Sequence, residues 1–236
     1  MWFVLSLVGL RTNGAHSNAR QNATQQFARA DAGDSAPCFL ILSWPARHTS
    51  IVGRNREMAR RTQYERRLLS RLADSDAWPN FAHPEFAERL ERVAVRSLSR
   101  RTTEADVTAI VIFHQLAEQM LRVLIEDNRF FIALSVLPAP IAFREQARQT
   151  FGQVLQALLD GVEFPRKQRL LKLAEDLNSI RNGVAHKLLQ RGSLNGLRAD
   201  AKKAHRLFNR MFAIYDDAHD HYRVTFHGIA KNVYEL

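Results

Sequence analysis

Residues 107–125 read VTAIVIFHQLAEQMLRVLI, the most apolar helical segment in the chain. Apolar side chains would cover more than one face of such a helix, so it should lie at the centre of a bundle, enclosed by other helices. Thr103 followed by Asp106 resembles a capping box and predicts that this helix starts at Thr103. The sequence therefore predicts an all-α protein built around one central helix.

Two helices are expected upstream of this segment. Residues 59–73 place apolar side chains on one stripe and arginines elsewhere, which is the pattern of an amphipathic helix. After a break rich in Asp, Pro and Asn, Pro84 occupies a plausible first helical position, and the helix should run to about Arg100. Both helices carry arginine clusters: Arg60, Arg61, Arg66, Arg67 and Arg71, then Arg92, Arg96, Arg100 and Arg101.

Three helices are expected downstream. Residues 142–159 show helical spacing, Pro165 should open the next helix, and the last should run from Leu197 to about Tyr222. We predict an up-and-down helical bundle at residues 103–222 and a basic helical extension at residues 58–102. Residues 223–236 should form a C-terminal tail, and residues 1–57 should be poorly structured or non-native.

Residues 1–50 differ in composition from the rest of the chain. The apolar run from Trp2 to Leu10 is shorter than a membrane-spanning helix and lacks the basic residues that precede the apolar part of a secretory signal. Dense helical sequence begins abruptly near Met58, which suggests that the working chain starts there. Secretion is the alternative, whereas a single cysteine, Cys38, is typical of a reducing compartment and favours the cytoplasm.

The chain has 34 Lys and Arg residues against 24 Asp and Glu residues, so its formal net charge is +10. A positive field of this size attracts polyanions such as RNA, or an acidic membrane surface. The alternative is that the arginines pair with nearby glutamates and remain in water. We expect RNA as a partner and no membrane.

One short stretch combines three side chains that can act on a phosphodiester: Arg181, Asn182 and, after a three-residue spacer, His186. Arginine offers a permanent forked charge for phosphate oxygens, histidine exchanges protons near neutral pH, and asparagine orients either partner or the substrate. Arg181 and His186 would point about 140° apart on a straight helix. A break at Gly183 or a second copy of the chain would be needed to bring them together.

This motif, with its apolar lead-in from Leu170 to Ile180, resembles the HEPN family of small helical domains over roughly residues 103–222. The resemblance implies a homodimer in which paired motifs form one composite site, and a metal-independent endoribonuclease without a cofactor. His186 would be the general base, Arg181 would bind the phosphate and Asn182 would position either group. A role as a toxin or defence effector with an antitoxin or nucleotidyltransferase partner is also implied. Leu188 replaces the tyrosine that toxin members of the family often carry two residues after the histidine.

Two other functions are compatible with the sequence. A non-catalytic adaptor could bind RNA or a protein through the basic N-terminal helices, with Arg181 and His186 serving only the structure. A metal site could use Asp217 with His221 and Asp216 with Asp220, since each pair is one helical turn apart. His114 and Glu118, also one turn apart, are expected in a supporting role in a polar pocket.

Overall fold

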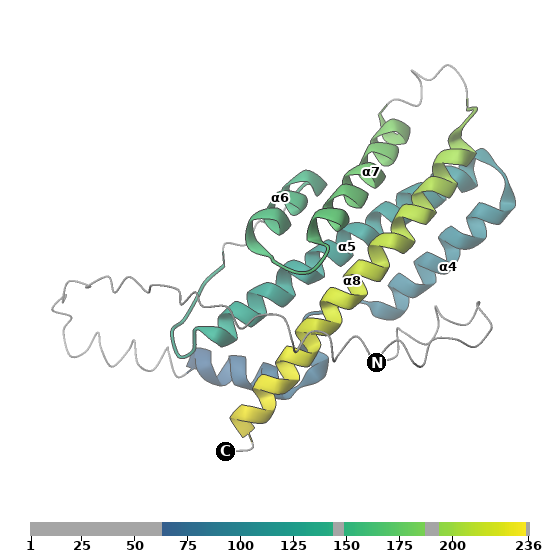
Figure 1. Ribbon diagram of the computed structural model, residues 1–236. Helices are drawn as coiled ribbons and strands as arrows, with labels where there is room; N and C mark the ends of the chain where they lie inside the picture. The colour runs from purple at the N-terminus through teal and green to yellow at the C-terminus, as the bar shows by residue number, and fades with distance from the viewer. Residues whose placement is uncertain (1–62, 144–148, 187–193, 235–236) are drawn as a thin grey trace, which may run out of the picture. The chain divides into compact units, whose positions relative to one another are not determined.

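The computed structural model describes residues 63–143, 149–186 and 194–234, which all belong to one compact unit, residues 51–236. Within these ranges the ordered elements are helices and no strand occurs, so the predicted all-α class is confirmed (Figure 1). Residues 1–57, which were expected to be poorly structured or non-native, lie outside the described residues, and so does Leu188.

Helix α5, Thr103–Ser135, lies at the centre of the unit and packs against α4, α6, α7 and α8 (Figure 1). Its buried side chains occupy several faces, among them Ile110, Phe113, Leu121 and Leu124, as the composition predicts. The cap differs from the prediction, because the side chain of Thr102, not Thr103, accepts the first-turn N–H of Ala105. The expected Thr103–Asp106 capping box is therefore wrong.

Helix α4, Pro84–Arg100, has the predicted bounds and packs along α5, burying Ala94 and Ser97. It ends where Arg101 adopts a left-handed conformation with φ 57°. The extension and the bundle therefore share one packed core across residue 102.

A short helix at residues 63–73 precedes α4 and is followed by the 3₁₀ turn η1, Ser75–Ala77. Its apolar side chains Leu68 and Leu72 are buried. The indole Nε1 of Trp78 donates to the carbonyl of Leu72 at 3.0 Å, which ties the end of this helix to the chain beyond η1.

Helix α6, Phe151–Gly161, begins later than the predicted position 142, and residues 144–148 of the predicted segment lie outside the described residues. It starts at Phe151, where Thr150 forms a capping box with Gln153. Helix α7, Lys167–Ala185, begins two residues after Pro165, where Arg166 has a left-handed backbone with φ 66°. Pro165 therefore precedes the helix and does not open it.

Helix α8, Leu197–Tyr234, is 38 residues long and continues past the predicted end at Tyr222. Phe226, inside the predicted tail, has no exposed surface and packs edge-on against the rings of Trp78 and Phe130. This buried contact explains the continuation, because residues 223–234 carry part of the core.

Helix α5 is long and apolar enough to cross a membrane by length and composition, and 67% of its most apolar window is buried within the unit. A central helix of a bundle has the same composition. This feature is therefore weak evidence for a membrane span.

Candidate functional site

Helix α7 presents the motif at the edge of the core. Its buried residues recur at helical spacing along one stripe that packs on α5, α6 and α8: Leu170, Leu173, Ala174, Leu177, Ile180 and Val184. Arg181 and Asn182 follow the buried Ile180 and are half-buried. The backbone of both residues is therefore anchored at the core, while their side chains reach solvent.

The first two motif residues contact each other. The guanidinium Nη1 of Arg181 donates to the side-chain Oδ1 of Asn182 at 3.1 Å. This contact uses one of the five N–H donors of the guanidinium, and the rest of its fork is available to other oxygens. The pair could bind a phosphate group, because arginine and an amide supply several donors from one place.

His186 lies at the end of the same helix and is exposed. It is the C-cap residue, and its backbone N–H donates to the carbonyl of Asn182 at 3.0 Å. Because α7 is continuous through Gly183 to Ala185, the alternative of a helix break at Gly183 does not apply. Among the contacts of the described residues, none joins Arg181 to His186, so one chain does not bring the two groups together.

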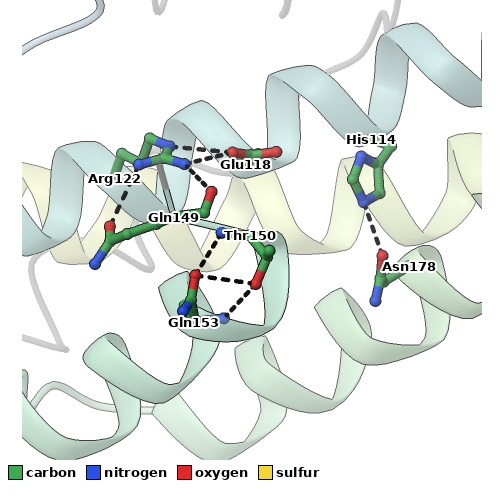
Figure 2. A network of polar contacts seen from close by, with 7 residues as sticks. All are labelled: His114, Glu118, Arg122, Gln149, Thr150, Gln153 and Asn178. Carbon is green, nitrogen blue, oxygen red and sulfur yellow. Dashed lines mark hydrogen bonds and ion pairs between the residues drawn. The ribbon is translucent and has the colours of Figure 1, made fainter. Parts of the chain in front are cut away.

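His114 of α5 contacts α7 at Asn178, one helical turn before the motif (Figure 2). Its ring is 5% exposed, and its Nε2 lies 3.1 Å from the side-chain Oδ1 of Asn178 on α7, as donor in the Nε2–H tautomer. The ring of Phe151, the first residue of α6, lies over it with centroids 4.4 Å apart. His114 thus joins three helices next to Arg181.

Burial lowers the pKa of His114, and the nearby positive charge of Arg181 lowers it further. The hydrogen bond that His114 donates to Asn178 and the negative charge of Glu118 both raise the pKa, and they do not reverse the shift. His114 is therefore neutral at pH 7, which suits a structural or positioning role beside Arg181.

Glu118, expected to accompany His114, is bound elsewhere. Its carboxylate pairs with Arg122 at 2.6 Å, and Arg122 also donates to the backbone carbonyl of Gln149 at 3.0 Å (Figure 2). Gln149 immediately precedes the Thr150 cap of α6, so this ion pair holds the start of α6 against α5. Asn178, Arg122 and Gln149 were not predicted from the sequence, although Arg122 lies one turn beyond Glu118 on the same stripe.

A second buried polar pair joins α5 to α8. The carboxylate of Asp127 has no exposed surface and accepts from Nδ1 of His219 at 2.7 Å. Burial raises the pKa of Asp127, and the contact with His219 opposes that shift. The ring of Tyr215 stacks on His219 with centroids 5.4 Å apart, and Nε of Arg223 donates to Nε2 of His219 at 3.4 Å.

The acidic and histidine-rich segment near the middle of α8 does not assemble as the metal alternative would require. Asp217 forms an ion pair with Arg166, and His219 turns inward to Asp127. In the parts of the chain that the structure describes, no three His, Cys, Asp or Glu side chains gather at metal-binding distance. Asp217 and His219 therefore serve contacts within the fold.

The polar side chains near the motif thus form a buried group around His114 and an accessible pair, Arg181 and Asn182, with His186 exposed separately at the end of α7. The accessible pair offers a cation and an amide to a ligand in solvent. No protein-family model, curated protein or solved structure matches the chain.

Proposed function

We propose that the protein is a metal-independent endoribonuclease of the HEPN type. The observation that carries the proposal is the placement of the motif: Arg181 and Asn182 lie paired at the solvent-accessible edge of α7, with exposed His186 at its end. The chemistry of these three residues supports a site for a phosphodiester, and the helical bundle agrees with the expected fold class.

The proposal requires a homodimer. On the continuous helix α7, Arg181 and His186 point about 140° apart, so one chain cannot direct both at the same phosphate. A two-fold axis near the end of α7 would place the arginine of one copy beside the histidine of the other. Isologous dimers of this kind are the commonest homo-oligomers.

The reaction proceeds by attack of a ribose 2′-hydroxyl on the adjacent phosphorus. His186 takes the hydroxyl proton as the O2′–P bond forms, while Arg181 binds the non-bridging oxygens. The P–O5′ bond breaks, and a solvent water gives a proton to the leaving oxygen. Asn182 orients the guanidinium. The products are a 2′,3′-cyclic phosphate and a 5′-hydroxyl, and DNA, which lacks the attacking group, is not cut.

The biological role and the partner that we propose follow from the resemblance to the HEPN family. We place the enzyme in the cytoplasm and give it the role of a toxin or defence effector, held in check by an antitoxin or nucleotidyltransferase partner. RNA is its substrate, and neither a cofactor nor a metal takes part.

The test is RNA cleavage in the presence of a chelator, with the chemical form of the new ends assayed. We expect His186→Ala and Arg181→Ala each to reduce the rate about 100-fold or more. Arg169→Ala and His221→Ala are matched controls, because both residues are exposed and lie outside the motif, and they should cleave normally. Cleavage that survives both motif substitutions would remove this site from the mechanism.

A second candidate function is a non-catalytic adaptor that binds RNA or a protein. The separation of Arg181 from His186 within one chain favours it, because a lone chain does not direct the phosphate-binding arginine and the base at one phosphate. Wild-type protein that binds RNA but yields no cyclic phosphate under any condition would support the adaptor over the enzyme.

A further inference from the structure

The first half of α8 presents a basic face to solvent, made of Lys202, Lys203, Arg206 and Arg210. All four side chains are exposed. At about 100° per residue they point to within about 100° of one another, so they share one side of the helix. Residues 201–215 contain no aspartate or glutamate, so four cations without an acid give this stretch a formal charge of +4.

The cations on either side of this stretch are engaged within the fold, whereas those of the basic face are not. Nη1 of Arg198, at the start of α8, donates to the carboxylate of Asp106 at 2.7 Å, and Arg166 forms an ion pair with Asp217. Inside the described parts of the chain, no hydrogen bond or ion pair engages the four side chains of the basic face. Their charge is therefore available to a ligand in solvent.

A polar pair borders the basic face. The amide Nδ2 of Asn209 donates to Nε2 of His205 at 3.2 Å, in the Nδ1–H tautomer, and the ring of His205 stacks on Phe113 with centroids 5.1 Å apart. Burial lowers the pKa of His205, and the positive charge of Arg206 lowers it further. The imidazole is therefore neutral at pH 7, and the positive charge of this side of α8 is that of the four cations.

The basic face has no apolar side chain that could insert into a lipid layer. Among the described residues, no large apolar side chain between Leu197 and Arg223 is exposed. The apolar residues of this part of α8 are turned into the core: Ala201, Ala204, Leu207, Phe208 and Met211. Helices that bind a membrane surface bury apolar side chains in it, so this face fits a dissolved polyanion better than a lipid surface.

The basic face lies toward the same end of the bundle as the motif. Two consecutive residues of α5, Phe113 and His114, contact His205 of α8 and Asn178 of α7 respectively, so these two contacts are at similar height along α5. Helices α7 and α8 run in opposite directions (Figure 1). One turn after Asn178 comes the motif, and one turn before His205 comes the first cation of the basic face, and both steps lead the same way along the bundle.

We propose that the basic face of α8 binds the phosphodiester backbone of RNA. The inference takes its ligand class from the proposed function but concerns binding alone. Lys202, Arg206 and Arg210 follow at four-residue intervals, so they form a row about 12 Å long that can meet more than one phosphate of a strand. Contacts of this kind neutralise phosphates and hold the strand without reading its sequence.

The test measures binding of a fluorescent single-stranded RNA by anisotropy, in the full chain carrying His186→Ala so that the RNA stays intact. We expect the triple variant Lys202→Gln, Arg206→Gln and Arg210→Gln to weaken binding about tenfold or more at low salt. The slope of log affinity against log salt should fall by about 0.7 for each lost phosphate contact. Because the three side chains are exposed, helical content by circular dichroism should match that of the parent protein.

The matched control is Arg89→Gln, Arg96→Gln and Arg100→Gln on α4, which removes the same charge from another exposed surface. On α4 three glutamates accompany four arginines, so its local charge is only +1, and this variant should bind RNA nearly as the parent does. Equal losses in the two triple variants would mean that net charge alone attracts RNA, and they would overturn the proposal.

Two further outcomes separate this proposal from its neighbours. If the α8 variant keeps its RNA binding but loses binding to phosphatidylserine vesicles, the face belongs to a membrane and the proposal is wrong. If the α8 variant loses RNA binding while protein with an intact His186 yields no cyclic phosphate, the nuclease fails and the binding face stands. Cleavage and binding that both survive in the α8 variant would leave the nuclease standing and remove the face.

Discussion

His114 shows how one buried imidazole can join three helices. Its ring hydrogen-bonds to Asn178 on α7 and lies under Phe151 at the start of α6, while its own helix is α5. A neutral ring suits this position, because a charged one would face the positive charge of Arg181 in surroundings with little water. The state of His114, and with it the contact between the three helices, should therefore depend on pH.

This sensitivity predicts how stability depends on pH. The pKa of His114 is lowered in the folded chain, so between that value and about 6.5 the unfolded chain binds more protons. The contribution of His114 to the free energy of unfolding is then complete above pH 6.5, and it falls as the pH is lowered through this window. Urea unfolding at pH 5, 6, 7 and 8 should show the loss in wild-type protein and a smaller loss in His114→Gln.

His205 is the matched control for this experiment, because burial lowers its pKa too and its substitution should remove a separate part of the same slope. An unchanged slope in His114→Gln would mean that this ring is not the titrating group.

The motif residues could be found from the sequence because they are neighbours in it. The polar residues around them could be predicted only in part, because the sequence indicated His114 and Glu118 but not the residues that bind them. His114 and Asn178 are 64 residues apart, and Arg122 and Gln149 are 27 apart. Such pairs depend on which helix faces go together, and the periodicity of one helix does not fix the rotation of the next.

Among the elements, α8 departs furthest from its prediction. Just beyond Tyr222 polar and apolar residues alternate, and Gly228 follows, so the pattern of a buried helix fades there. Phe226 nevertheless falls one turn after Tyr222 and fills the space between Trp78 and Phe130. The start of α6, by contrast, could have been placed at Phe151 from the sequence, since Thr150 with Gln153 is a capping-box pattern.

The extended α8 predicts that its last turns contribute to stability. Phe226→Ala should lower the free energy of unfolding by about 3–5 kcal/mol, because it removes a fully buried ring. Val224→Ala, at a side chain that is 70% exposed, should change it by less than about 0.5 kcal/mol. Thermal or urea unfolding of the two variants gives the comparison, and equal small effects would show that this end of α8 does not belong to the core.

For the whole molecule, the sequence predicted the all-α class and the central helix, since α5 is apolar on several faces and needs helices around it. It did not predict that α4 would share that core. The break between them is only Arg101 and Thr102, and a tight corner of this kind lets two helices lie side by side.

A composite site shared by two chains predicts that two inactive variants can complement each other. Arg181→Ala and His186→Ala proteins, each inactive alone, should regain part of the RNA cleavage when mixed, because a mixed dimer contains one intact arginine and one intact histidine from different chains. The regained rate should follow the fraction of mixed dimers, measured by native mass spectrometry. Mixed dimers that form and stay inactive would contradict a site shared between chains.

The pairing of Asp127 with His219 has a consequence for how this sequence can change over generations. Replacing either residue alone leaves a polar atom without its partner in the interior, whereas replacing both with apolar residues of similar volume costs little. Drift at these two positions, 92 residues apart, must therefore proceed in linked steps, and a chain that has lost the acid will also have lost the imidazole.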